Sequence, residues 1–248
     1  MSALLLALIA GAVVGLALGA LGGGGSVLAV PALIYLLDFT PAAATTASLI
    51  IVTATSATAL YTHATSSNVR WKTGALFAAA GIPPAIAAAT LAARLPEAAL
   101  TAAFAGIAAL AALRMLKPPD PDPRPRTVRP ARAAGAGAGL GAVTGFLGVG
   151  GGFLAVPALV SVLGLRMRAA VGTSLLVITV NSLAALAARA GTDTPLRWAV
   201  IAPFAGAAIL GAWDGKRLAA KISGPTLQRI FAIVLLAVAA LMLTDAIH

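Results

Sequence analysis

The stretch from Gly15 to Ile34 reads GLALGALGGGGSVLAVPALI, and it returns 126 residues later as GAVTGFLGVGGGFLAVPALV, from Gly141 to Val160. Twelve of the twenty aligned positions are identical. Each copy is an apolar helix-like run, then a glycine cluster, then a short apolar run that reaches a proline. Because each glycine destabilises a helix by about 1 kcal/mol relative to alanine, each cluster predicts a broken helix inside an apolar segment.

The composition around the two copies is that of a membrane protein. The 248 residues are 60% hydrophobic and only 10% charged, with a mean hydropathy of +1.00, whereas soluble domains are about 25% charged. Several apolar runs approach the ~20 residues that cross a bilayer as a helix, and lipid-exposed backbone must satisfy its own hydrogen bonds. We therefore predict an all-α integral membrane protein, with the runs 3–21, 43–62, 75–93, 98–113, 133–147 with 153–164, 169–188, 199–213 and 226–244.

The charged and reactive residues exclude several functional classes. The net charge of +10 comes from Lys and Arg between the apolar runs, which is typical of membrane topology signals and not of a nucleic-acid surface. There is no cysteine, there are two histidines, and no acidic cluster lies in the apolar runs, so neither a metal centre, a cofactor nor an intramembrane enzyme is expected. A structural or assembly protein would not need two glycine breaks beside a polar helix face.

The duplication covers nearly the whole chain. Beyond the quoted stretch, Ser48 matches Ser174 at the same offset, and at an offset of 127 the pair Arg70-Trp71 matches Arg197-Trp198. A proline-rich charged segment joins the halves and predicts an extended loop outside the bilayer. The predicted organisation is repeat 1 at 1–116, a cytoplasmic linker at 117–132 and repeat 2 at 133–248.

The Lys and Arg positions favour one of two topologies. If each glycine-broken segment enters the membrane and returns, each half adds three transmembrane helices and the halves are inverted, with fourteen Lys and Arg on the linker side and three on the other. If each broken segment crosses once, the halves are parallel and the division is ten to seven. The positive-inside rule favours the inverted repeats, each with a re-entrant helical hairpin, as in many secondary transporters.

The glycine clusters are the first candidate site. A helix that starts after the break points unpaired N–H groups and the positive end of its dipole into the protein, which suits an anion. The alternative is close helix packing through small residues. The candidate substrate-binding residues here are Gly22, Gly23, Gly24, Gly25, Ser26, Gly148, Gly150, Gly151 and Gly152.

The polar helix that follows each cluster is the second candidate element. Residues seven apart share one helix face, so neutral donors could line up there to bind an oxyanion, although interhelical hydrogen bonding is the alternative. His63 and Arg189 are equivalent positions at the ends of these helices, where a cation could gate or attract an anion or could simply extend to the interface. The polar candidates are Ser48, Thr55, Ser56, Ser174, Asn181 and Ser182.

Other charged residues have simpler interpretations. Arg70-Trp71 and Arg197-Trp198 are typical of interfacial anchors. Asp214 lies beside Lys216 and Arg217, which favours a surface ion pair.

The motif from Gly141 to Pro157, G-x-x-x-G-x-x-G-x-G-G-G-x-x-x-V-P, resembles the TauE/SafE family of sulfite exporters, also called the toluene sulfonate uptake permease family. The segment from Arg168 to Ser182, RAAVGTSLLVITVNS, resembles that family's A-x-G-T-S-L-x-x-x-x-x-N-S signature. The first half departs from it, with Thr46-Ala47-Ser48 for Gly-Thr-Ser and Thr55 for Asn.

The resemblance implies a secondary transporter of small sulfur-containing anions such as sulfite, working as an exporter or facilitator in the bacterial inner membrane. An uptake carrier for organosulfonates or small organic acids, sodium-coupled in one version, is the alternative. The implied partners are the anion and the lipid bilayer, and a homodimer is a further candidate assembly.

Overall fold

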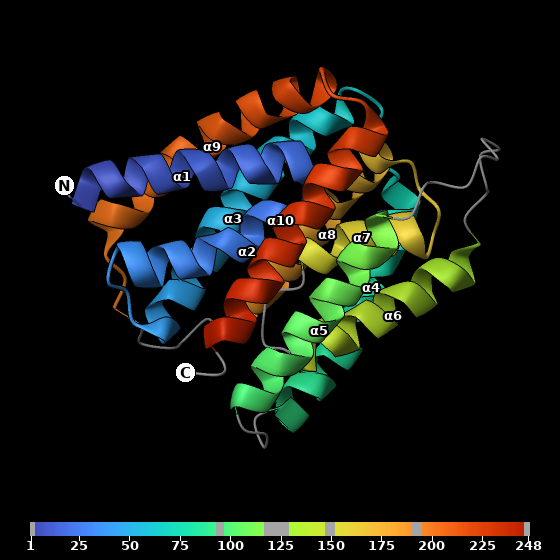
Figure 1. Cartoon of the computed structure of the whole chain (residues 1–248), viewed down its shortest axis with the longest axis horizontal. Coiled ribbons are helices and arrows are strands. Elements are labelled where there is room, and N and C mark those ends of the chain that lie inside the picture. The colour runs from blue at the N-terminus through green and yellow to red at the C-terminus, as the bar shows by residue number, and fades with distance from the viewer. Residues whose placement is uncertain (1–2, 93–96, 117–128, 147–151, 190–194, 246–248) are drawn as a thin grey trace.

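The computed structural model describes residues 3–92, 97–116, 129–146, 152–189 and 195–245. Within these ranges every regular element is a helix, as predicted (Figure 1). The first glycine cluster separates two helices, and the second lies between two others. The elements are α1 (Ala3–Leu21), α2 (Gly24–Pro31), the π-helix η1 (Ala32–Leu36), α3 (Pro41–Ala64), α4 (Trp71–Ala92), α5 (Glu97–Leu116), α6 (Pro130–Phe146), α7 (Gly152–Ser161), α8 (Met167–Ala188), α9 (Trp198–Ala220) and α10 (Gly224–Asp245).

Four helices of the described chain are long and apolar enough to cross a membrane. They are Ala3–Leu21, Ala42–Ala64, Met167–Ala188 and Trp198–Ala220. Three of them, in α3, α8 and α9, coincide with expected crossings. The fourth is α1, which the sequence predicts as one limb of a re-entrant hairpin. It reaches 19 residues because its internal glycines face another helix and do not break it.

The glycines of α1 allow α9 of the other half to approach closely. A Cβ atom on Gly15 would lie 1.9 Å from the carbonyl oxygen of Ala208, so no larger residue fits at this crossing. Successive contacts advance along both helices in the same direction, which makes the pair parallel. The contacts are Gly11 with Phe204, Gly15 with Ala208 and Gly19 with Ala212.

Helices α4 and α6 repeat this packing with the halves exchanged. A Cβ on Gly141 would lie 2.0 Å from the carbonyl oxygen of Gly81. Each contact is the repeat equivalent of one between α1 and α9. The α6 residue lies 126 positions after its equivalent in α1, and the α4 residue lies 127 positions before its equivalent in α9. The set is Gly137 with Phe77, Gly141 with Gly81 and Gly145 with Ala85.

Helices α3 and α8 cross in opposite directions. The Ser56 and Thr179 hydroxyl oxygens lie 2.9 Å apart near the middle of the two helices. Ten residues from each of these positions, the Arg189 guanidinium donates to the Thr46 hydroxyl at 3.3 Å. Residue numbers rise along α3 as they fall along α8, so the helices are antiparallel.

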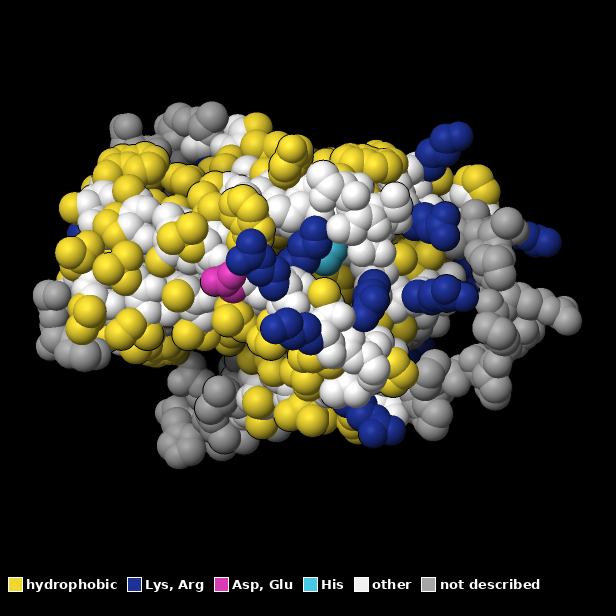
Figure 2. All heavy atoms as spheres, turned by 90° about the horizontal axis from the view of Figure 1, so that it is seen from above, with side chains coloured by type: hydrophobic (Ala, Val, Ile, Leu, Met, Phe, Trp, Pro, Cys, Tyr) yellow, Lys and Arg dark blue, Asp and Glu magenta, His cyan; other side chains and the backbone are white. Residues whose placement is uncertain are grey.

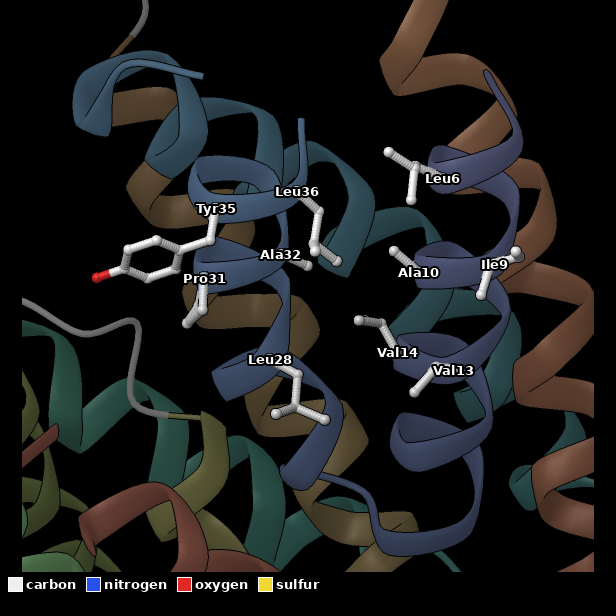
Figure 3. Close-up of a pocket in the computed structure, with 10 residues that line it drawn as sticks. All are labelled: Leu6, Ile9, Ala10, Val13, Val14, Leu28, Pro31, Ala32, Tyr35 and Leu36. Carbon is white, nitrogen blue, oxygen red and sulfur yellow. The ribbon is translucent and has the colours of Figure 1, made fainter. Parts of the chain in front are cut away.

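The first broken segment is a helical hairpin. Figure 3 shows α1 running down to the glycine turn and α2 with η1 running back beside it. The turn end of the hairpin is tightly packed, since a Cβ on Gly25 would lie 2.4 Å from the Leu18 Cβ.

The basic residues gather at one end of the helices. Hydrogen bonds join the end of α9 to the start of α8 (Arg168 to the Ala220 carbonyl, 3.2 Å) and the start of α10 to the end of α5 (Gln228 to the Met115 carbonyl, 2.6 Å). Figure 2 shows Lys and Arg side chains over one half of a face and mostly hydrophobic side chains over the other. This basic end carries eleven of the thirteen described Lys and Arg residues, namely Arg70, Lys72, Arg114, Arg129, Arg132, Arg166, Arg168, Lys216, Arg217, Lys221 and Arg229.

Candidate functional site

The first glycine turn combines a left-handed residue with the start of a helix. Gly22 has φ +70 and donates its N–H to the Leu18 carbonyl at 2.8 Å, which closes α1. Gly23 then precedes α2, and no side chain caps the start of that helix. The first backbone N–H groups of α2 are thus directed to the region beyond the turn, which is the arrangement that an anion site would need.

The turn lies against the second half of the chain. A Cβ on Gly22 would be 2.5 Å from the Ser174 hydroxyl, 3.2 Å from Val156 and 3.3 Å from Val171. Val156 belongs to α7, one turn after its start, and Ser174 belongs to α8. The predicted Gly22 and Ser174 are therefore brought together, about 10 Å from the start of α8 at 1.5 Å per residue.

The other predicted glycines divide into two groups. Gly24, Gly25 and Ser26 form the first turn of α2, and Gly152 begins α7, where it is buried. Gly148, Gly150 and Gly151 lie outside the described residues, so the second half of the predicted anion site remains a prediction.

Most hydroxyl groups of the polar helices use their hydrogen within their own helix. Thr55 donates to the Ile51 carbonyl at 2.6 Å, and Ser174 donates to the Val171 carbonyl at 2.8 Å. Because a hydroxyl has one hydrogen, these groups direct only lone pairs to their surroundings. The same local bonding holds for Ser48, Thr53, Ser56, Thr58, Thr62 and Thr179.

Asn181 and Ser182 differ from these hydroxyl residues. The Asn181 side-chain oxygen is buried and has no hydrogen-bond partner. Ser182 is only 7% exposed, and its hydroxyl makes no hydrogen bond in the described part of the chain. Asn181 lies seven residues after Ser174, so the two share one face of α8, with Asn181 about 10 Å farther along the helix from the glycine turn.

His63 and Arg189 are not brought together, because equivalent ends of antiparallel helices lie far apart. His63 is 5% exposed at the basic end, and its Nε2 atom lies 3.3 Å from the Gly19 carbonyl oxygen of α1. Arg189 lies at the opposite end, against Thr46. The two positions cannot share one anion.

Two basic residues have roles that the sequence interpretation missed. Lys216 donates to the Thr62 carbonyl in the last turn of α3, whereas the expected ion pair of Asp214 forms with Arg217 at 3.6 Å. Arg197 donates to the Leu37 carbonyl just after η1 and lies 4.2 Å from the centre of the Phe39 ring. Both contacts connect one half of the chain to the other. The position of Lys216 directly after Gly215, a glycine at a close helix crossing, is the sequence signal that could have indicated its contact with α3.

A groove between α1 and α2 is separate from this site. It encloses about 390 Å³, and Figure 3 shows aliphatic side chains and Tyr35 along its walls. The aliphatic side chains that form most of its wall offer no donors to an anion.

Comparison with known proteins agrees with the membrane-spanning helices. The family model "Sulfite exporter TauE/SafE" matches residues 7–242. Two proteins named "Probable membrane transporter protein", from Xylella fastidiosa strains 9a5c and Temecula1, are each 32% identical over 237 residues, covering 92% of this chain and 90% of theirs. No solved structure matches. The chain therefore belongs to the sulfite exporter TauE/SafE family of membrane transporters.

Proposed function

We propose that the protein moves small sulfur-containing oxyanions, sulfite first among them, across the bacterial inner membrane as an exporter or facilitator. The observation that carries the proposal is the buried amide of Asn181, whose oxygen has no partner. Buried polar groups are almost always hydrogen-bonded, so an amide with an unpaired atom in a transporter suits a ligand that binds during the cycle. The oxygen itself only accepts hydrogen bonds, and the amide nitrogen beside it is the group that would donate to the anion.

The proposed site has donors of three kinds. The start of α2 supplies backbone N–H groups beside Gly22, and the Asn181 amide and Ser182 hydroxyl supply side-chain donors from α8. These groups are neutral, so the anion is held without a permanent countercharge, and it can leave again at the end of a cycle.

We propose that the two halves are inverted repeats, 1–116 and 133–248, with the basic end and the linker in the cytoplasm. Two observations support this. The equivalent helices α3 and α8 are antiparallel, as inversion requires. The basic end holds eleven of the thirteen described Lys and Arg residues, in the direction of the positive-inside rule.

The membrane potential would favour export by such a carrier. Moving one charge through 100 mV is worth about 2.3 kcal/mol, so an anion leaves a negative interior without a coupling ion. The second candidate function is sodium-coupled uptake of an organosulfonate or small organic acid. It is favoured by the lone pairs that the α3 and α8 hydroxyls present, because hydroxyl oxygens are sodium ligands in such folds.

The test is sulfite flux in proteoliposomes with an imposed potential, comparing Asn181→Leu with Thr58→Val. Both changes replace a polar side chain by an apolar one of similar size, but Thr58 bonds only within its own helix. Losing a hydrogen bond to a charged ligand costs about 1.5–3 kcal/mol, so Asn181→Leu should weaken sulfite binding by roughly 10- to 100-fold. Equal flux in both variants would refute the site, and flux that needs sodium would favour uptake.

A further inference from the structure

Three helices from both halves are joined at the basic end by two polar contacts. Lys216 of α9 donates to the Thr62 carbonyl of α3. The next residue, His63, contacts the Gly19 carbonyl of α1 through Nε2 at 3.3 Å. We call these two contacts the basic-end latch. It holds the last turn of α3 against the segment of α1 that leads into the Gly22 turn.

The backbone packing brings Lys216 to this place. A Cβ on the preceding Gly215 would lie 2.3 Å from the Leu16 carbonyl oxygen, so α9 lies directly on α1. The carboxylate nearest in sequence, Asp214, pairs with Arg217 at 3.6 Å. Among the described residues, Lys216 therefore has a neutral carbonyl as its hydrogen-bond partner and no salt bridge.

The latch can open at low cost on both sides. The Thr62 carbonyl also accepts from the Thr65 hydroxyl at 2.7 Å, so it stays satisfied when Lys216 leaves. The Nδ1 atom of His63 is buried without a partner while the latch is closed. Opening to water would give Nδ1 a donor, and the closed state has none to offer.

An anion is the natural competitor for Lys216. Ten other described Lys and Arg residues surround this end and raise the local anion concentration. An anion attracts the Lys216 ammonium by a full opposite charge, whereas the Thr62 carbonyl offers only a dipole. The helix-end carbonyl of Thr62 would then be exchanged for the oxyanion.

We propose that Lys216 is the first contact of the anion at the basic end, and that its exchange of the Thr62 carbonyl for the anion releases the latch and frees the Gly22 turn to move. This inference rests on the proposed transport, to which it adds the step that links anion arrival to opening. Lys216 binds the anion directly in this step, and His63 makes the closed state easy to leave.

The absence of cysteine in the chain makes the test direct. Val171 is 1% exposed and lies beside Gly22, so V171C reports whether the turn has moved. Its rate of labelling by a membrane-impermeant maleimide is measured in lipid nanodiscs with sodium methanesulfonate or, at equal ionic strength, sodium gluconate. The same reporter is placed with Lys216→Ala, Lys216→Arg and, as the charge-matched control, Lys221→Ala.

We expect methanesulfonate to speed labelling at least tenfold in the parent and in the Lys221→Ala protein. In gluconate, Lys216→Ala should already be labelled as fast as the parent is in methanesulfonate, and methanesulfonate should not raise its rate further. Lys216→Arg should behave as the parent. Slow labelling in Lys216→Ala, or acceleration that survives it, would overturn the latch. If V171C does not fold, V156C in α7 is the second reporter, because Val156 is buried beside the same turn.

The two proposals fail separately. Latch behaviour as described, in a protein that moves no sulfite, would overturn the proposed function and leave the latch standing. If the protein transports sulfite but Lys216→Ala labels as the parent does in both salts, the latch is overturned and the proposed function stands.

Discussion

Replacing Gly22 by alanine tests whether the glycine turn is fitted to α8. Gly22 has φ +70, and its missing Cβ would lie 2.5 Å from the Ser174 hydroxyl. Gly164 has nearly the same backbone conformation, φ +68, but nothing lies within 4 Å of its missing Cβ. The pair of variants therefore separates the cost of the conformation from the cost of the contact.

The expected magnitudes follow from these two environments. An alanine in the left-handed region costs about 1–2 kcal/mol, and both variants share this cost. In Gly22→Ala the Ser174 side chain must also rotate and give up its bond to the Val171 carbonyl, 2.8 Å long, which adds about 1 kcal/mol. The free energy of unfolding should thus fall by about 1 kcal/mol more in Gly22→Ala than in Gly164→Ala.

The assay is denaturant unfolding in detergent micelles, with sulfite flux measured on the same preparations. Adding Ser174→Ala should recover the extra loss in the Gly22→Ala background and recover nothing in the Gly164→Ala background. Flux should fall in Gly22→Ala and remain near the parent level in Gly164→Ala. Equal unfolding free energies for the two single variants would refute the fitted turn.

The remaining predictions concern topology and packing. Reporter fusions should place His248 outside and Pro125 inside, as the basic end requires, and finding both on one side would contradict inverted repeats. Gly15→Leu and Gly141→Leu should each lower the unfolding free energy by more than about 2 kcal/mol, because overpacking would force the close helix pairs apart. Gly106→Leu, where nothing lies within 4 Å of the missing Cβ, should be neutral or stabilising, because leucine favours a helix more than glycine does. A matching loss there would show that the close helix contacts do not explain the effect.

The helical class and the position of the first break could be predicted because they depend on local chemistry. A cluster of four glycines cannot continue a helix, and α1 accordingly ends at Leu21 while α2 starts at Gly24. The repeat offset also predicts which contacts between distant residues should occur in equivalent pairs. Equivalent positions in the two halves make equivalent contacts, as Gly15 with Ala208 and Gly141 with Gly81 show.

The partners of these contacts could not be predicted from one sequence. A stripe of glycines four apart indicates a close crossing, but it does not say that α1 of the first half pairs with α9 of the second. The role of Lys216 depends on that pairing, since only the approach of α9 to α1 brings its side chain to the end of α3. Its sequence neighbours instead favoured the ion pair that Arg217 makes.

The polar residues show why a duplicated scaffold need not hold a duplicated site. Thr55 and Asn181 are equivalent positions, and the sequence favoured both as donors to the anion. The Thr55 hydroxyl is short and donates to the Ile51 carbonyl one turn earlier, so its hydrogen is already used. Asn181 carries both donors and an acceptor on a planar amide, and its oxygen finds no partner within α8. Two halves of similar backbone can thus differ in their polar side chains, with the first supplying the Gly22 turn and the second supplying Ser174, which lies against it.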